Sequence, residues 1–340
     1  MSRQFNDTKI KKTNKFKKVL KWFGISILLI LAVLIALPFI FKDKLIEVVK
    51  TEVNNSVNAT IEWGDFDLTL FSSFPDFKFD IQDVSVTGIN EFEGVNLAKI
   101  KNTSIDLDLM SVINGGKIKI KSIEINEPDL NFIINKDSLA NYDIAKGIEE
   151  ETSEIESTEA TTYEIGLKNL VITNAHINYQ DAIAQMSSEV KGMNLELSGD
   201  FTQDVFDAKT KTTIKELTFT DGLVSYLNKT NVDLVANVLI DKFTKYTLQE
   251  NNLKLNELEV GFDGWIEMLD EKMDMNLTFN SKRTDFKSIL SLVPAVYLTD
   301  FKDIKTKGNL ALNGNMKGTL EGENYPEFNL NMAIDNGYFK

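Results

Sequence analysis

The sequence predicts a mainly β protein, in which a transmembrane helix precedes an extended, curved antiparallel sheet that forms a hydrophobic groove, with a few short helices. Three observations support this prediction. Apolar and polar residues alternate in many short runs, turn residues often separate the runs, and a stretch of twenty residues near the N-terminus has no charge. Alternation with a period of two gives each strand one apolar and one polar face.

The first 41 residues predict a membrane anchor behind a basic head. Residues 1–21 have a net charge of +7, since eight Lys and Arg residues stand against Asp7. Trp22–Phe41 would form a helix about 30 Å long, which matches the apolar core of a bilayer. This stretch ends in Pro38-Phe39-Ile40-Phe41 without a small-residue cleavage site, which favours an uncleaved anchor over a signal peptide. Basic residues on its N-terminal side predict a cytoplasmic N-terminus, with the bulk of the chain across the membrane.

Composition excludes two classes of function. The formal net charge is −14, which leaves −21 for residues 22–340. An acidic main part opposes the binding of nucleic acid, so we expect no nucleic-acid partner. The chain has no cysteine, so disulfides and thiolate chemistry are excluded.

Beyond the anchor, the sequence predicts two β regions. Residues 42–58 have apolar side chains at helical spacing and predict a juxtamembrane helix. The β regions at 59–146 and 163–340 flank the acidic stretch 147–162, which predicts a flexible loop. Within the second region, a helix is predicted near 284–293, with Thr284 or Asp285 as its cap. Short connections elsewhere predict antiparallel pairing, because they cannot span a parallel crossover.

The alternating runs are about five to nine residues long, and we expect on the order of 20 strands. The alternation slips by one residue after Gln82-Asp83 and again between Ile120 and Ile123. Turns are predicted at Asn114-Gly115-Gly116, Asp221-Gly222, Asp263-Gly264, Asn313-Gly314 and Asp335-Asn336-Gly337. Since the last turn would leave a strand without its partner, we expect the sequence to be an N-terminal fragment of a longer protein.

The apolar side of these runs is the candidate functional site. Its candidate residues are Phe77, Phe79, Ile81, Ile105, Leu107, Leu109, Ile118, Ile120, Leu258, Val260, Phe262, Met273, Met275, Leu277 and Phe279. Three architectures would cover this side: two packed sheets, a closed barrel, or an open sheet whose trough holds something other than protein. Periodicity does not choose among the three.

The sequence offers no set of catalytic or metal-binding residues. His176 is the only histidine and is expected on the polar side of a strand, and one histidine without other strong ligands builds neither a triad nor a metal site. Asp65/Asp67 and Asp106/Asp108 have the spacing that chelation needs, but a solvated strand face gives the same spacing. We therefore expect no enzyme activity, no metal and no cofactor.

Three segments together resemble parts of a known protein family. The stretch FSSFPDFKFDIQDVSVTG at 71–88, after a single anchor, resembles the start of AsmA-like proteins, particularly the long versions found in Bacteroidetes. Residues 120–144 resemble that family's recurring unit, in which two strands around a proline lead to Asn-aromatic-Asp, here Asn141-Tyr142-Asp143. Residues 285–318 resemble its helix-then-hairpin element. The likeness covers most of residues 15–340.

The resemblance implies a protein of the bacterial inner membrane with a groove-shaped sheet in the periplasm. Its implied role is to move phospholipid between envelope membranes and to support outer-membrane biogenesis. The implied partners are phospholipid, the inner membrane through Trp22–Phe41, and an outer-membrane or other envelope protein. The alternative hypothesis is a membrane-tethered scaffold for envelope assembly, built as a dry β-sandwich. An open apolar channel would favour transport, whereas two sheets packed about 10 Å apart would favour the scaffold.

Overall fold

In the computed structural model, the chain divides into two compact units, Met1–Thr51 and Glu52–Lys340. The structure describes residues 50–69 apart from 52, 76–108, 119–146, 167–269, 272–285, 292, 306–322 and 324–339. The predicted anchor Trp22–Phe41 lies outside these residues. Within them, no helix is long and apolar enough to cross a membrane. The described end of the predicted juxtamembrane helix, 50–56 apart from 52, is helical.

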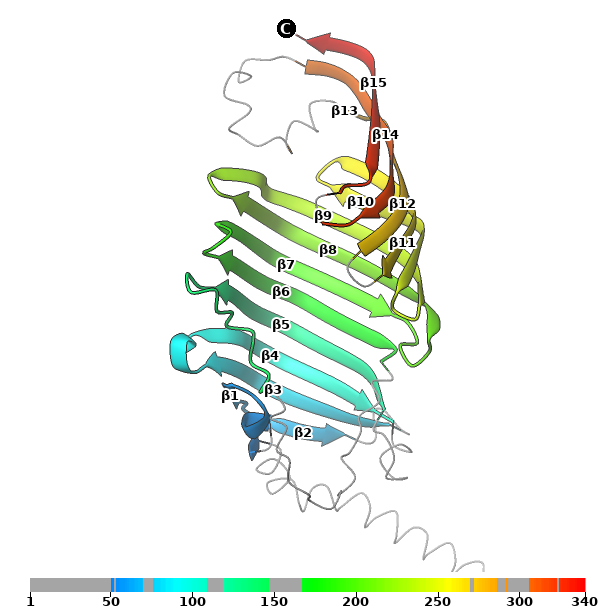
Figure 1. Ribbon diagram of the computed structural model, residues 1–340. Helices are drawn as coiled ribbons and strands as arrows, with labels where there is room; N and C mark the ends of the chain where they lie inside the picture. Colours follow the sequence, from blue (N-terminus) through cyan, green and yellow to red (C-terminus); the bar gives the residue numbers. More distant parts are fainter. Residues whose placement is uncertain are drawn as a thin grey trace, which may run out of the picture. The chain divides into compact units, whose positions relative to one another are not determined.

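The second unit contains a single open, curved sheet of 15 strands (Figure 1). The mainly β prediction is therefore confirmed. The strands are β1 (Ala59–Glu62), β2 (Phe66–Thr69), β3 (Phe77–Gly88), β4 (Asn96–Leu107), β5 (Ile120–Ile134), β6 (Asn169–Asp181), β7 (Met186–Ser198), β8 (Val205–Asp221), β9 (Val224–Asp241), β10 (Lys245–Leu255), β11 (Leu258–Leu269), β12 (Lys272–Ser281), β13 (Thr284–Asp285), β14 (Thr306–Leu320) and β15 (Glu327–Phe339). Asn90–Phe92 forms a 3-10 turn, η1, between β3 and β4.

The strands follow one another in the sheet almost in chain order. The main path runs β1-β3-β4 through to β12-β14-β13, with β2 also on β3 and β15 also on β14. The two predicted β regions are thus parts of one sheet, and its end strands do not close into a barrel. The prediction of antiparallel pairing is wrong at one place, because β5 and β6 are parallel. A parallel pair requires the chain to return from the end of one strand to the level at which that strand began. The connection between β5 and β6, which includes the acidic stretch 147–162, is long enough for this return.

The structure describes 15 strands, and these are longer than the alternating runs from which on the order of 20 were expected. From β3 to β15, apart from β13, each strand has 10 to 18 residues. Asp221-Gly222 does form a turn, between β8 and β9. Asp263-Gly264, Asn313-Gly314 and Asp335-Asn336-Gly337 instead lie inside β11, β14 and β15. Asn114-Gly115-Gly116 lies outside the described residues.

For the helix predicted near 284–293, the structure describes the two candidate cap residues and Leu292. Thr284 and Asp285 form β13 and pair with Leu310 and Asn309 of β14. Apart from Leu292, the rest of the predicted helix lies outside the described residues.

The predicted slip of the alternation at Asp83 is confirmed and is shared with the neighbouring strands. Asp83 has a φ of 50°, and Glu127 on β5 has a φ of 49°. Ile81 pairs with Thr103 before the slip, and Val84 pairs with Ile100 after it. The alternation therefore changes phase at the same level in β3 and β4, and the register between the two strands is kept. Apolar side chains therefore stay on the same side of the sheet along the whole strand. Such irregular residues bend a strand, and we attribute part of the curvature to them.

Candidate functional site: an open apolar groove

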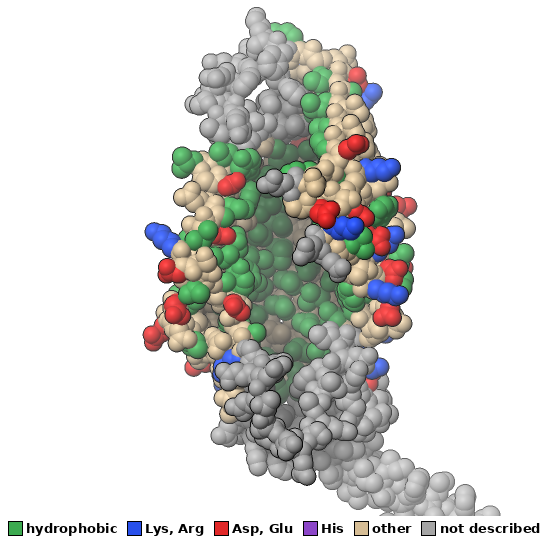
Figure 2. All heavy atoms as spheres, viewed as in Figure 1, with side chains coloured by type: hydrophobic (Ala, Val, Ile, Leu, Met, Phe, Trp, Pro, Cys, Tyr) green, Lys and Arg blue, Asp and Glu red, His purple; other side chains and the backbone are tan. Residues whose placement is uncertain are grey.

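One face of the sheet is apolar across its strands. Residues paired between neighbouring strands project from the same face. Ile105 on β4 pairs with Ile123 on β5, and at the far end Leu277 on β12 pairs with Met316 on β14, which pairs with Phe328 on β15. Figure 2 shows the result: hydrophobic side chains line a hollow that runs along the sheet, with charged side chains at its flanks.

The pairing places the described candidate residues together on this face. They are Phe77, Phe79, Ile81, Ile105, Leu107, Ile120, Leu258, Val260, Phe262, Met273, Met275, Leu277 and Phe279. Leu109 and Ile118 lie outside the described residues. That these side chains line a lipid site remains a prediction.

The face also includes residues that the candidate set missed. In the middle of the sheet it is formed by Leu170, Ile172, Ile177, Leu195, Val232, Leu234, Ala236, Val238 and Ile240. The alternation from Val232 to Ile240 is plain in the sequence and could have identified that strand. On β6 the alternation is interrupted at Asn174, whose φ is 52°, so the two halves of this strand do not share one pattern.

Little covers this face in the part of the chain that the structure describes. Only eleven hydrophobic residues there are buried, and five of these are alanines, of which four lie on the groove floor: Ala98, Ala175, Ala208 and Ala236. The described strands belong to one sheet, not to the two packed sheets of the scaffold hypothesis. On β10 to β12 a hollow of about 260 Å³ is lined by Leu253, Val260, Phe262, Leu277 and Phe279. A concave apolar surface of this kind suits aliphatic chains.

The Asn-aromatic-Asp motif organises a strap at one edge of the groove. Beyond Asn96, the first residue of β4, the Asn141 side chain accepts a hydrogen bond from Ile133 N–H (2.8 Å) and donates one to the Asn131 carbonyl (2.7 Å). Asn141 is 3% exposed, so its amide satisfies β5 backbone groups that no strand reaches. Tyr142 packs edge-on against Phe132, with 5.8 Å between the ring centroids.

The strap then continues to the first strand of the sheet. Asn58 N–H donates to the Ile144 carbonyl (2.7 Å), and Val57 and Ala145 form an isolated bridge. Figure 1 shows this segment running from the end of β5 past β4 and β3 to β1. The strap thus ties β5 to the N-terminal end of the sheet.

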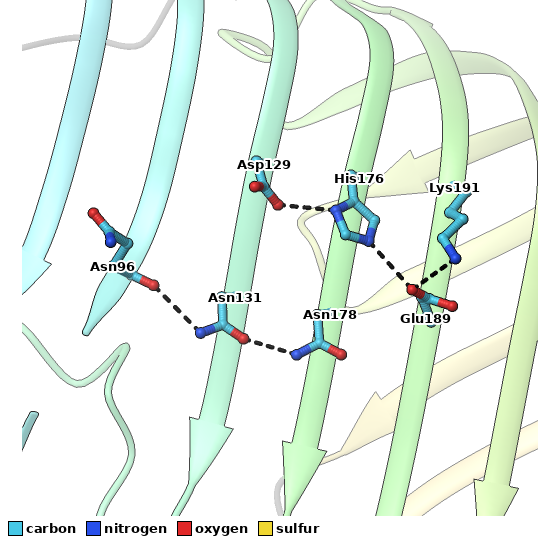
Figure 3. A network of polar contacts seen from close by, with 7 residues as sticks. All are labelled: Asn96, Asp129, Asn131, His176, Asn178, Glu189 and Lys191. Carbon is cyan, nitrogen blue, oxygen red and sulfur yellow. Dashed lines mark hydrogen bonds and ion pairs between the residues drawn. The ribbon is translucent and has the colours of Figure 1, made fainter.

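The opposite face is polar, and His176 lies on it (Figure 3). His176 Nδ1 is 3.0 Å from an Asp129 carboxylate oxygen and Nε2 is 3.5 Å from Glu189 Oε1. The hydrogen bond from Lys191 lowers the pKa of Glu189. Asn178 donates to Asn131 Oδ1 (2.8 Å) alongside. These residues pair with one another, and the described residues include no group of three or more His, Cys, Asp and Glu that could hold a metal ion.

Asp106 and Asp108, the second carboxylate pair considered in the sequence, also lie on the polar face. Asp108 forms an ion pair there. Lys121 Nζ lies 2.8 Å from Asp108 and 2.7 Å from Asp76. Asp106 is different, because burial raises its pKa and one of its carboxylate oxygens has no hydrogen-bond partner. Lys121 thus compensates the charge of Asp108, whereas the charge of Asp106 is compensated only in part, by Lys78.

Comparison with known proteins gives one family. The protein-family model described as "AsmA family" matches residues 13–306. No curated protein and no solved structure gives a significant match. The matched span contains every strand from β1 to β13.

Proposed function

The chain belongs to the AsmA family, and on that premise we propose that it binds the acyl chains of phospholipids in its apolar groove and moves them between envelope membranes. The protein would be a single-pass protein of the bacterial inner membrane, with a cytoplasmic N-terminus and the sheet in the periplasm. It would contribute to outer-membrane biogenesis without catalysis. Family membership supports a role connected with the cell envelope and its lipids.

The observation that carries the proposal is the apolar face, which continues through the pairing from β3 to β15 and which little covers among the residues that the structure describes. Soluble monomeric proteins seldom expose such a large contiguous apolar patch unless a ligand, a partner or a membrane binds to it. Burial of a methylene group contributes about 0.8 kcal/mol, so an acyl chain that lies along this face would be held by many small contributions. Such binding requires no specific polar pocket, and the head groups could remain in water at the flanks.

The proposed location rests on the sequence of the N-terminal part. Trp22–Phe41 is free of charge and long enough to span a bilayer, and the basic residues before it favour the cytoplasmic side. A sheet that begins shortly after this segment could receive lipid from the same membrane. The N-terminal strands would then form the entry to the groove.

The proposal can be tested with the full chain in mild detergent and a phospholipid that has a photoactivatable diazirine in its acyl chain. We expect cross-links to peptides from β10 to β12. Phe279→Asp places a charge on the apolar face and should reduce these cross-links about tenfold, because a carboxylate beside an acyl chain is costly to desolvate. Asn280→Asp is the matched control on the polar face and should have no effect. Equal labelling of the two variants would refute the proposal.

A further inference from the structure

The lining of the groove changes from aliphatic to aromatic at one of its two long flanks. We call this edge the strap flank, because the strap runs along it and β6 turns into β7, and β8 into β9, at the same edge (Figure 1, left). One row of groove residues across β5 to β8 is entirely aliphatic: Leu130, Ile177, Val190 and Leu217. The next row toward the strap flank is mostly aromatic: Phe132, Tyr179, Ser188 and Phe219.

Two further tyrosines extend the aromatic row. Tyr142 of the strap packs against Phe132, and Tyr226 on β9 lies 6.2 Å from Phe219 between ring centroids. Tyr142 and Tyr226 are 42% and 41% exposed. A tyrosine combines an apolar ring with a polar hydroxyl, so it suits a boundary between an apolar region and water. The row therefore marks where the apolar groove ends.

The outermost row of the strap flank adds two carboxylates to this boundary. The register places its residues side by side on β5 to β8: Ile134, Asp181, Met186 and Asp221. Asp181 accepts hydrogen bonds from the backbone N–H groups of Ala184 (2.8 Å) and Ile183 (2.9 Å), which hold its pKa below the ordinary value. It is therefore ionised at neutral pH. The Tyr179 hydroxyl donates to its second oxygen at 3.3 Å, so an aromatic ring and a negative charge lie next to each other.

We propose that the strap flank seats the head group of a phospholipid that has a terminal ammonium group. The ammonium would lie beside the rings of Tyr142, Tyr179 and Tyr226 and the carboxylates of Asp181 and Asp221, with the acyl chains on the aliphatic rows. This inference rests on the proposed function and adds to it the class of lipid and the side that the head group takes. Aromatic faces attract cations, and aromatic cages are used to recognise quaternary ammonium ligands.

The carboxylates also act against other lipids. A head group that has only negative charge would meet the like charges of Asp181 and Asp221 without a compensating ammonium. Selectivity of this kind depends on unfavourable contacts with the wrong ligand as well as on favourable contacts with the right one. We therefore expect anionic phospholipids to bind less well than zwitterionic ones.

At the opposite flank of the central strands, the aromatic residues pack against one another instead. Phe206 is buried there, and its ring centroid lies 4.8 Å from that of Phe201 and 5.7 Å from that of Phe243. The Tyr246 hydroxyl donates to the Phe243 carbonyl (2.8 Å) within its own turn. This cluster fills its own space, so the strap flank is the better place for a head group.

The test uses the full chain in mild detergent and three lipids with the same diazirine-bearing acyl chain. Phosphatidylethanolamine has a terminal ammonium, phosphatidylglycerol is anionic without one, and diacylglycerol is uncharged. We expect phosphatidylethanolamine to label peptides from β5 to β9 about threefold more than either of the other two. Equal labelling by phosphatidylethanolamine and diacylglycerol would overturn the proposal, because the flank would then only repel anions.

Charge-neutral variants locate the seat. Asp181→Asn keeps an acceptor for the two backbone N–H groups of its turn and removes the charge. The double variant Asp181→Asn/Asp221→Asn should abolish most of the preference for phosphatidylethanolamine. Asp207→Asn/Asp233→Asn makes the same change of charge on the polar face and is the matched control, which should retain the preference. An unchanged preference in the first double variant would overturn the proposal.

The rings are tested separately from the charges. Tyr142→Leu removes an aromatic ring and should lower the preference, whereas Tyr142→Phe keeps the ring and should retain it, because the ring attracts the cation. Equal preferences in these two variants would exclude the ring of Tyr142 from the seat and contradict the proposal.

The outcome is separable from that of the proposed function. Equal labelling of the groove by all three lipids would refute the head-group seat alone and leave lipid binding in place. Absence of labelling by every lipid would refute lipid binding, and the seat with it.

Discussion

Asn141 stabilises the sheet through its side-chain amide, which forms hydrogen bonds with the backbone of β5 beyond Asn96, the first residue of β4. One buried side chain satisfies both a backbone donor and a backbone acceptor there. Replacement of such a group leaves two buried backbone groups without partners, which costs more than the loss of one exposed hydrogen bond.

We predict that Asn141→Ala lowers the free energy of unfolding by about 1–3 kcal/mol. The measurement is urea denaturation followed by circular dichroism. Asn178→Ala is a matched control, because its amide donates to Asn131 Oδ1 on the polar face and involves no backbone group. Its loss should be smaller, and equal losses would contradict the assigned role of Asn141.

A second residue-scale prediction concerns Asp106 and pH. Burial raises its pKa above the ordinary value of 3.8, so the folded state binds this proton more tightly than the unfolded state. The ionised carboxylate therefore destabilises the fold, and this effect grows as the pH rises from about 3.8 through the raised pKa. At neutral pH, Asp106→Asn should increase the free energy of unfolding by less than about 1 kcal/mol. Near pH 3 the two proteins should be equally stable.

Asp108→Asn is the natural comparison, because Asp108 forms an ion pair with Lys121. Its removal should decrease stability at neutral pH. Thermal unfolding at several pH values measures both effects, and a loss of stability in Asp106→Asn at neutral pH would show that the burial of Asp106 is compensated.

At the scale of single elements, strands could be located from alternation, but their lengths and ends could not. The slip at Asp83 was predictable because apolar residues change phase there, and the structure shares this slip with β4 and β5. Glycine-containing pairs misled the prediction of turns. Gly264 has a φ of 133°, and an added Cβ would lie 2.0 Å from the Asn276 carbonyl oxygen of β12. Glycine is there to allow a close approach between strands, which cannot be distinguished from a turn in the sequence.

This geometry predicts that Gly264→Ala destabilises the protein by more than about 3 kcal/mol, because both the backbone conformation and the contact forbid a side chain. Gly94→Ala is the control, since Gly94 also has a positive φ but no atom within 4 Å of the added Cβ. It should cost only about 1 kcal/mol. Similar losses in denaturant melts would show that β11 and β12 are not so close at Gly264.

At the scale of the whole sheet, the sequence predicted one apolar face per strand but did not decide what covers it. The strands of a sandwich, a barrel and an open trough have the same alternation. These architectures differ only in which strands, often distant in the sequence, lie next to each other. The parallel pairing of β5 and β6 illustrates the difficulty, because the sequence between these strands has no alternation that would indicate how they pair. The candidate residues include regular runs such as that of Leu277 and Phe279, but they omit the equally regular run from Val232 to Ile240. On β6, the alternation is interrupted at Asn174, and the groove residues could not be predicted from it.

The central claim is that the apolar face holds lipid along its length, and photo-cross-linking in living cells tests it most directly. A photoreactive amino acid would replace single residues in the full chain, in cells whose phospholipids are labelled with ³²P. The apolar-face positions are Phe79, Ile177, Leu234 and Leu277, and their polar-face neighbours are Asp80, Asn178, Asp233 and Thr278. We predict labelled adducts at all four apolar-face positions and background levels at the neighbours. Equal labelling of the two faces, or no lipid adduct from the apolar face, would contradict the account.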